Sequence, residues 1–472
     1  MREFQQIPTP ALKVWQMRSR LLSALGIVVL ALAGCGGQSD PKAVPSSAAP
    51  QQPEAADIEI VGDAEAPVNK LAMAAIVNLQ EFWGEQFPKL YGDDYAPVEG
   101  GLYALTPDSE QGPECASSFA DVSGNAFYCK IDDSVSWDAD GLLPELQQKF
   151  GDFVIPVVLA HEWGHAMQQR SGFFDQNEYT VSAELQADCF AGAWSSHARE
   201  TGVFEVSEAE LDTALAGILD LRDTPGTSAQ DGSAHGSGFD RVSAFQDGYD
   251  NGVERCKDYQ DGEPMVLELP FTTEEDAANE GNAPYDSIVN GVPYDIEDFW
   301  TQLYPELTGG QVWQPVAGLA PFDPADPPLC GGTPADGYAL FYCVPDDYVA
   351  WDNVNVMPQI YDEGGDYAVA TLLATQYGLA ALTRVGDQSD EKTSTLRADC
   401  LAGGYTASVI LYNREATSSY HISPGDLDEG IKALLVFRSE GDAQRQGAGF
   451  ARVRAFRQGV LEGAESCLDY QP

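Results

Sequence analysis

The sequence predicts a mainly helical α+β protein in which one unit of about 200 residues occurs twice in tandem. Three observations lead to this prediction. Short motifs of the first half recur in the same order about 210 residues later. Each half also contains four cysteines at similar positions. Finally, an apolar stretch that begins near Phe153 has the length and composition of a buried helix.

The repeat is clearest where aromatic, acidic and cysteine residues recur together. The recurring motifs are Phe127-Tyr128-Cys129 with Phe341-Tyr342-Cys343, Ala187-Asp188-Cys189 with Ala398-Asp399-Cys400, and Gly238-Phe239 with Gly449-Phe450. Because the spacing between partners drifts only slightly, the two copies are expected to differ by short loop changes. This pattern is typical of a duplicated domain rather than of a solenoid.

The N-terminal segment is expected to be a targeting signal and not part of the fold. A basic leader precedes an apolar run at 21–32, which is too short for a good membrane span. The run ends in Leu-Ala-Gly-Cys, which resembles the lipobox of bacterial lipoproteins. Residues 1–35 are therefore predicted to be a lipoprotein signal peptide, with lipid on Cys35 anchoring the chain to the membrane. A plain secretory signal or an uncleaved anchor is the alternative.

In either case the body of the protein is expected to leave the cytoplasm. The lipoprotein prediction places it at a bacterial cell membrane, facing the periplasm or the cell exterior. Residues 36–65, rich in Ser, Ala, Pro and Gln, are expected to form a flexible linker. Residues 66–260 would then form a first, zinc-binding domain. The acidic stretch 261–281 reads as a second linker, and residues 282–472 as a degenerate repeat.

The composition is that of a folded and strongly acidic protein. Hydrophobic residues make up 44% of the chain, and 74 Asp and Glu against 25 Lys and Arg give a formal net charge of −49. Such a charge argues against binding to nucleic acid or to anionic lipid headgroups. We interpret it as a solvated acidic surface that keeps a secreted protein soluble, with a cation-binding role as the alternative.

The cysteines are expected to form disulfide bonds. Of the nine cysteines, eight remain when Cys35 is set aside, an even number in an oxidising compartment. Four cysteines in each half allow three connectivities per half. We favour one local and one long-range bond in each: Cys115–Cys129, Cys189–Cys256, Cys330–Cys343 and Cys400–Cys467.

A candidate metal site lies in the predicted buried helix. This helix is expected to begin near Asp152, as its N-cap, and to end at Arg170 with Gly172 closing it. It contains His161 and His165, which lie one turn apart on one face and can bind one zinc ion. Between them, Glu162 can reach a water on that metal and act as general base.

A catalytic zinc ion needs a third protein ligand, and Glu184 is the candidate. It follows His165 at a distance that leaves room for a turn and a second helix. On that helix Asp188 lies one turn further and would accept a hydrogen bond from the outer nitrogen of a zinc-binding histidine. Since Asp188 recurs as Asp399, it is alternatively a residue that serves helix packing.

The second half lacks the metal-binding groups. The aligned pairs are His161 with Thr375, Glu162 with Gln376, His165 with Leu379, and Glu184 with Thr395. Gly164, by contrast, keeps its partner Gly378. The second half is therefore expected not to bind zinc in this way, but to be a structural or substrate-binding partner.

His235 is a further candidate, because it too has no histidine partner in the second half. It precedes a helix that Ser237 can cap, with Asp240 in the box position. His235 could stabilise the oxyanion formed when water attacks a carbonyl. Alternatively, it is a surface or capping histidine. Tyr179 is a weaker candidate for the same role.

These motifs together resemble the neutral zinc metallopeptidases of bacteria. The matching residues are Phe127-Tyr128-Cys129, the motif at 161–165, the stretch at 184–189, and His235-Gly236 followed by Arg241, Phe245 and Gly248. The resemblance covers about residues 66–259 and, in decayed form, 283–470. It implies a zincin-like metallopeptidase fold, duplicated in tandem, with Zn²⁺ held by His161, His165 and Glu184.

The implied activity is hydrolysis of peptide or protein substrates outside the cytoplasm, by zinc-bound water that Glu162 activates. Two alternatives stay open. One is a non-catalytic, lipid-anchored binding or scaffold protein that kept the metallopeptidase-like fold. The other is a zinc hydrolase that acts on another amide, such as a peptide link of the cell wall.

Overall fold

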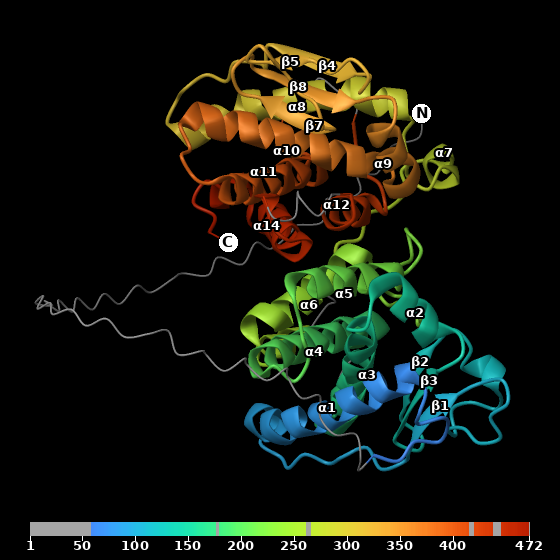
Figure 1. Ribbon diagram of the computed structural model, residues 1–472. Helices are drawn as coiled ribbons and strands as arrows, with labels where there is room; N and C mark the ends of the chain where they lie inside the picture. Colours follow the sequence, from blue (N-terminus) through green and yellow to red (C-terminus); the bar gives the residue numbers. More distant parts are fainter. Residues whose placement is uncertain (1–57, 176–178, 261–265, 415–419, 438–444, 472) are drawn as a thin grey trace, which may run out of the picture. The chain divides into compact units, whose positions relative to one another are not determined.

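The computed structural model describes residues 58–175, 179–260, 266–414, 420–437 and 445–471 (Figure 1). These residues belong to one compact unit. The predicted signal peptide, its lipidation site Cys35 and most of the linker predicted at 36–65 lie outside them. None of the helices in the described ranges has both the length and the apolar character needed to cross a bilayer.

The first half consists of a long helix, a small sheet and a group of helices. Its main elements are α1 (Pro67–Tyr91), β1 (Leu102–Leu105), β2 (Ala126–Cys129), β3 (Ser134–Asp138), α2 (Leu142–Phe150), α3 (Val154–Ser171), α4 (Thr180–Thr201), α5 (Glu208–Asp220) and α6 (Gly238–Asn251). Short 3₁₀ helices lie at Phe119–Asp121 (η2), Phe173–Asp175 (η3) and Arg255–Tyr259 (η4). The helical majority beside one small sheet confirms the mainly helical α+β prediction.

The second half presents similar elements in the same order. Its main elements are α8 (Tyr285–Thr308), β4 (Gly318–Phe322), β7 (Leu340–Cys343), β8 (Tyr348–Asp352), α9 (Val356–Gly364), α10 (Asp366–Val385), α11 (Glu391–Leu411), α12 (Asp426–Leu435) and α14 (Gly449–Glu462). Short additions are α7 (Glu274–Ala278), β5 (Leu329–Cys330), β6 (Thr333–Pro334) and η5 (Ala464–Ser466). Helix α7 lies inside the segment that was predicted to be a linker.

The two three-stranded sheets share one topology. Their strand orders are β1-β3-β2 and β4-β8-β7, and in each the first pair is parallel and the second antiparallel. Each antiparallel pair turns at an aspartate with positive φ, Asp133 at 57° and Asp347 at 54°. The Tyr128 hydroxyl donates to Asp133 and the Tyr342 hydroxyl to Asp347, both at 2.7 Å. Hence the recurring Tyr and Asp residues hold these turns.

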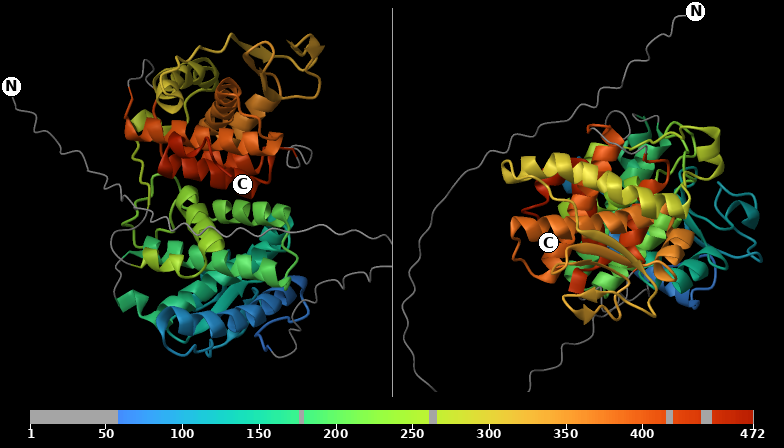
Figure 2. Two further views of the ribbon diagram at one scale, coloured as in Figure 1. Left: turned by 90° about the vertical axis from the view of Figure 1, so that its left-hand side faces the viewer. Right: turned by 90° about the horizontal axis from the view of Figure 1, so that it is seen from above.

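Helix α3 lies at the centre of the first half, because nearly all of its residues from Val154 to Gln168 are buried. Helix α1 packs against it, as α8 packs against α10 in the second half (Figures 1 and 2). The predicted N-cap was wrong: α3 begins after Phe153, and the Asp152 carboxylate instead accepts a hydrogen bond from Gln147. Gly172 ends the helix in the left-handed conformation, as predicted.

The closest helix contact in each half depends on glycine. A Cβ atom on Gly192 of α4 would lie 1.9 Å from the Phe245 carbonyl oxygen of α6, and one on Gly248 would lie 1.7 Å from the Cys189 oxygen. Gly403 and Gly459 make the corresponding contacts between α11 and α14. Since no side chain fits between these backbones, each helix pair is held at a fixed separation.

The structure contains all four predicted disulfide bonds, Cys115–Cys129, Cys189–Cys256, Cys330–Cys343 and Cys400–Cys467. The two long-range bonds each close a separation of 67 residues. In the chain-entropy model a bond of this kind stabilises the fold by about 4 kcal/mol. In the first half it joins α4 to η4, just beyond the α4–α6 contact.

The two halves exchange equivalent hydrogen bonds. Asp428 of α12 accepts the Phe239 N–H at the start of α6, at 2.8 Å. In return, Asp212 of α5 accepts the Phe450 N–H at the start of α14. Both aspartates follow a leucine near the start of a helix. Each half therefore supplies a carboxylate to the first turn of a helix in the other half, where negative charge is favourable.

Candidate metal centre

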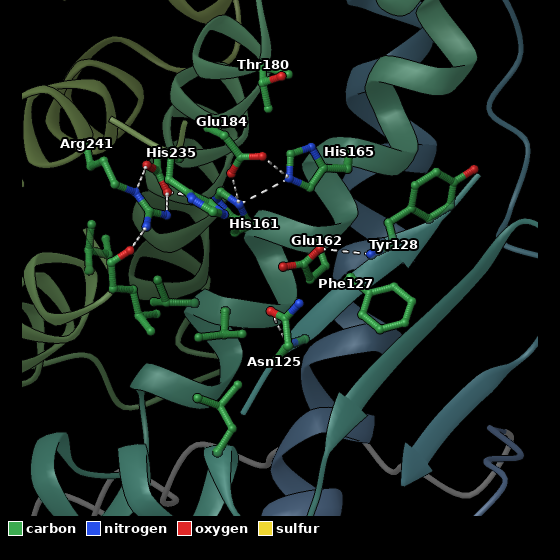
Figure 3. Close-up of a pocket in the computed structure, with 18 of the residues that line it drawn as sticks. Asn125, Phe127, Tyr128, His161, Glu162, His165, Thr180, Glu184, His235 and Arg241 are labelled. Atoms are coloured by element: carbon green, nitrogen blue, oxygen red, sulfur yellow. Dashed lines mark hydrogen bonds and ion pairs between the residues drawn. The ribbon is translucent and has the colours of Figure 1, made fainter. Parts of the chain in front are cut away.

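Helix α3 brings the two motif histidines together. His161 and His165 lie one turn apart, and their Nε2 atoms are 3.2 Å from each other (Figure 3). Glu184 reaches them from α4, with one carboxylate oxygen 3.1 Å from His161 Nε2 and the other 3.5 Å from His165 Nε2. The three side chains that the sequence predicted as ligands thus converge, from two neighbouring helices of the first half.

Two ring nitrogens and one carboxylate are a donor set that suits zinc. Burial opposes the charged form of His161, but Asp188 and Glu184 outweigh it and raise the His161 pKa to about 10. Burial also opposes the charge on Glu184, yet His165 and His161 hold the Glu184 pKa well below its usual range. A divalent cation among these groups would replace the imidazole protons as the partner of the carboxylate.

Glycine allows the two ligand-bearing helices to meet. A Cβ atom on Gly164 of α3 would lie 2.8 Å from the Ala187 Cα atom of α4. Gly378 makes the same approach to Ala398 in the second half, at 3.0 Å from Cα. This contact explains why the glycine is present in both halves although the histidines are not.

Asp188 has two partners, which combine the two roles considered for it. Its carboxylate lies 2.8 Å from His161 Nδ1 and accepts two hydrogen bonds from Arg241, at 2.7 and 2.9 Å. In the second half Asp399 accepts the same pair of bonds from Arg452. The ion pair with arginine therefore serves both halves, whereas the contact with histidine occurs only in the first.

In the second half, Thr375 stands where the first half has His161. Its hydroxyl donates to Asp399 at 3.0 Å, in place of the His161 ring. Asp188 accordingly orients His161 so that Nδ1 carries the proton and Nε2 faces Glu184.

Gln168, which sequence reasoning missed, orients the second histidine. His165 Nδ1 lies 2.9 Å from the Gln168 side-chain oxygen, and the Gln168 amide donates to the Ala183 carbonyl at 2.6 Å. Gln168 is fully buried, so its position is fixed by packing as well. The available signal was its place three residues after His165, on the same helix face.

Glu162 lies beside the cluster without joining it. Its carboxylate accepts the Tyr128 backbone N–H of β2 at 2.9 Å, and burial raises its pKa. Figure 3 shows Glu162 between the histidines and strand β2, which carries Phe127 and Tyr128. A carboxylate with raised proton affinity at this position is suited to take up a proton from water.

One cavity of about 570 Å³ is lined by His161, Glu162, His165, Glu184, Asp188 and Arg241. Apolar side chains form part of its wall: Leu142, Val154, Val157, Val158, Ile218 and Leu221. Strand β2 lies at the edge of its sheet and contributes residues 126–128 to the same cavity. The site is therefore open to an extended ligand and has an apolar region next to the ionisable groups.

His235 also lines this cavity, and Ser237 caps α6 as predicted. The Ser237 hydroxyl, and not His235, accepts the Asp240 N–H. The His235 side chain is half-exposed, and its Nδ1 atom lies 3.2 Å from Asp223. Asp223 also accepts the His235 backbone N–H at 2.7 Å. Sequence reasoning missed Asp223, which lies in a loop without a local motif.

Tyr179, the weaker candidate for the role of His235, lines the cavity as well.

The first half of the chain is similar in sequence to known proteins. Residues 18–259 match the family model described as "Putative neutral zinc metallopeptidase". The chain is 30% identical over 205 residues to the uncharacterized protein YpfJ of Escherichia coli strain K12, which covers 39% of this chain and 68% of YpfJ. It is also 30% identical over 166 residues to the uncharacterized protein Rv2575 of Mycobacterium tuberculosis strain H37Rv, covering 30% of this chain and 56% of that protein. No solved structure matches the chain.

Proposed function

The chain belongs to the family of putative neutral zinc metallopeptidases, and from this premise we propose that it hydrolyses peptide bonds with a zinc ion held by His161, His165 and Glu184. The observation that carries the proposal is the convergence of these three side chains, with the Glu162 carboxylate beside them. When bound, zinc supplies a Lewis acid that polarises a carbonyl group and acidifies water.

The chain's own residues would divide the remaining work. Glu162 accepts the proton of the attacking water and passes it to the leaving amine. Asp188 and Gln168 keep the two imidazoles turned with Nε2 toward the site. His235, held by Asp223, stabilises the negative charge that develops on the carbonyl oxygen.

The cavity favours an extended peptide with an apolar side chain. Strand β2 is the outer strand of its sheet and borders the cavity, and such an edge can pair with the backbone of a bound peptide, except at the Tyr128 N–H, which Glu162 accepts. The apolar wall formed by residues of α2, α3 and α5 would receive the neighbouring side chain.

We propose further that the second half is a degenerate copy of the first. Element order, sheet topology and disulfide bonds correspond, and so do the buried Asp–Arg pairs. The second half carries Thr375, Gln376 and Leu379 where the first has its zinc motif. It would act as a structural partner whose aspartate Asp428 supports α6 of the first half.

A location outside the cytoplasm is part of the same proposal. It is supported by four disulfide bonds, which persist in oxidising compartments, and by the lipobox-like sequence ending at Cys35. Substitution Cys35→Ser should release the chain from the membrane fraction of cells, and continued sedimentation with membranes would contradict lipid anchoring.

The proposed function is tested by Glu162→Gln. The variant should retain zinc, measured by elemental analysis, and lose cleavage of an unfolded protein substrate by at least about 100-fold, in line with the loss of a general base. Glu85→Gln on the exposed face of α1 is the control and should cleave normally. Cleavage at the wild-type rate by purified Glu162→Gln would refute the assignment of the base. A wild-type chain that binds no zinc would instead favour the binding or scaffold protein.

A further inference from the structure

Three carboxyl groups gather in the second half, away from the candidate zinc site. They belong to Asp366 at the start of α10 and to Asp426 and Glu429 in α12. One oxygen of each lies within 4.8 Å of an oxygen of each of the others. The side chains of Asp366 and Asp426 are both only 2% exposed. Ionised carboxylates this close together repel one another strongly inside a protein.

The backbone holds each of these carboxylates in place. In every case one oxygen accepts a main-chain N–H, so the orientation of the group does not depend on its neighbours in the cluster. The three bonds run from Ala283 to Asp366 at 2.9 Å, from Ser423 to Asp426 at 2.7 Å, and from Tyr367 to Glu429 at 2.8 Å. The cluster is thus arranged before any ligand arrives.

The second oxygens of Asp366 and Asp426 are the independent observation. Both are buried, and in the described part of the chain neither accepts a hydrogen bond from an N–H or hydroxyl group; the Asp366 carboxyl has only the Glu429 carboxyl as a further neighbour at hydrogen-bond distance. Within the same residues, none of the three carboxylates forms an ion pair with lysine or arginine, in contrast to Asp428, which pairs with Arg222. Buried carboxylate oxygens left in this way are costly unless a cation binds them.

The first half has no such cluster, so the fold itself does not require it. The first half has an exposed Asp152 where the second has Asp366. Aligning α5 with α12 on their Leu-Asp pairs places a partly exposed Glu210 opposite Asp426 and Thr213 opposite Glu429. The buried trio is therefore a feature of the second half alone.

We propose that Asp366, Asp426 and Glu429 bind a hard divalent cation of the calcium class. The donors are all oxygen atoms, which suit Ca²⁺ better than zinc, because zinc prefers nitrogen and sulfur ligands. Three carboxylates supply three to six of the ligands that Ca²⁺ takes, and water can supply the others. A cavity of about 390 Å³ reaches Asp366 and one of about 340 Å³ reaches Glu429, so water has access from both sides.

The cation would connect the start of α10 to α12. Helix α12 also carries Asp428, which contacts the start of α6 in the first half. Binding would therefore stabilise the second half and the contact through which it supports the first. This role is independent of the proposed peptidase activity, because none of the three residues lines the zinc site.

The test is calcium titration of the full chain, freed of calcium on a chelating resin and then saturated with zinc. Calorimetry with CaCl₂ should show one saturable site, and about 1 mM CaCl₂ should raise the Tm by several degrees. Asp426→Asn and Glu429→Gln should both abolish the saturable heat and the Tm shift. Glu363→Gln, an exposed neighbour on α9, should keep both.

The proposal is overturned if CaCl₂ produces neither saturable heat nor a Tm shift in the wild-type chain. It is equally overturned if Asp426→Asn and Glu429→Gln respond to calcium as the wild type does. Should either variant fail to fold, the wild-type titration still decides, and Asp366→Asn provides the third substitution. A loss of calcium binding that leaves peptide cleavage intact would separate this site from the proposed function.

Discussion

Asp188 and Asp399 are equivalent residues, of which only Asp188 contacts the candidate metal site. Both are buried, and both accept two hydrogen bonds from an arginine on the following long helix. Only Asp188 has an imidazole as third partner, and only there does a ring Nε2 atom face a carboxylate, that of Glu184. The second half thus provides a natural control for every substitution of this pair.

We predict that Asp188→Asn lowers zinc affinity about 10- to 100-fold, the usual cost of losing a partner of a zinc-binding histidine. Both Asp188→Asn and Asp399→Asn should lower the Tm by similar amounts, because each weakens an equivalent pair with arginine. Asp399→Asn should nevertheless leave zinc affinity unchanged. Zinc titration against a competing chromophoric chelator measures the affinity. Equal affinities of the two variants would mean that Asp188 acts only in packing.

Helix packing positions the site through contacts that exclude any side chain. Gly248 of α6 brings the backbone of α4 close, and α4 carries both Glu184 and Asp188. Gly459 makes the same contact with α11, which carries no ligand. The separation of the two helices therefore determines where Glu184 lies relative to α3.

Gly248→Ala and Gly459→Ala should each destabilise the chain by about 1–3 kcal/mol, as expected when an atom is forced into a packed contact. Thermal unfolding measures this loss. Only Gly248→Ala should also weaken zinc binding, since it displaces the helix that carries Glu184. If Gly459→Ala weakened zinc binding equally, the site would depend on helix packing in the second half as much as on the position of α4.

The start of α6 contains a titrating group. Burial raises the pKa of Asp240 to about 7, although hydrogen bonds from Ser237 and Leu267 oppose the shift. The folded chain therefore retains a proton that the unfolded chain, with a carboxyl pKa near 3.9, has released. The stabilising contribution of this group is complete below about pH 4 and is lost as the pH rises toward 7.

Asp240→Asn cannot titrate, so its Tm minus that of the wild type should become more positive between pH 5 and pH 8. Scanning calorimetry at constant ionic strength measures the difference. Glu210→Gln, at the exposed capping box of α5, is the control and should show no such trend over this range. A pH-independent difference for Asp240→Asn would show that Asp240 is ionised throughout.

The chain as a whole is held together by a reciprocal exchange between its halves. Asp212 and Asp428 each accept an N–H at the start of a helix in the opposite half, and Arg222 pairs with Asp428. Aromatic contact between Tyr249 and Phe450 adds to the same interface. The second half thereby supports α6, which supplies Arg241 to the candidate zinc site of the first half.

Asp212→Ala and Asp428→Ala should each cost about 1–2 kcal/mol, the usual effect of losing a capping carboxylate. Asp428→Ala should lower the Tm further than Asp212→Ala, because it also leaves Arg222 without its ion pair. Thermal unfolding of both variants and of the double variant measures this. Equal effects would indicate that the Arg222 pair contributes nothing to stability.

Much of the candidate metal site could be predicted from the sequence alone. Helical periodicity alone places His161 and His165 on one face, and a second helix places Glu184 and Asp188 one turn apart. The internal repeat supported the cysteine pairing, because the same four positions occur twice. It also singled out the residues whose chemistry the second half lacks. These predictions rest on local geometry, which the chain specifies over a few residues.

The tertiary structure was needed to reveal the contacts between distant segments that no motif or repeat relates. The Asp188–Arg241 pair, the support of His235 by Asp223, and the exchange of capping carboxylates join residues that no periodicity relates. The carboxylates of Asp366 and Asp426 meet because α10 and α12 pack together. The two residues are far apart in the sequence, so this contact could not be predicted from it. Such contacts depend on how buried surfaces fit, a property of the assembled helices rather than of any single stretch.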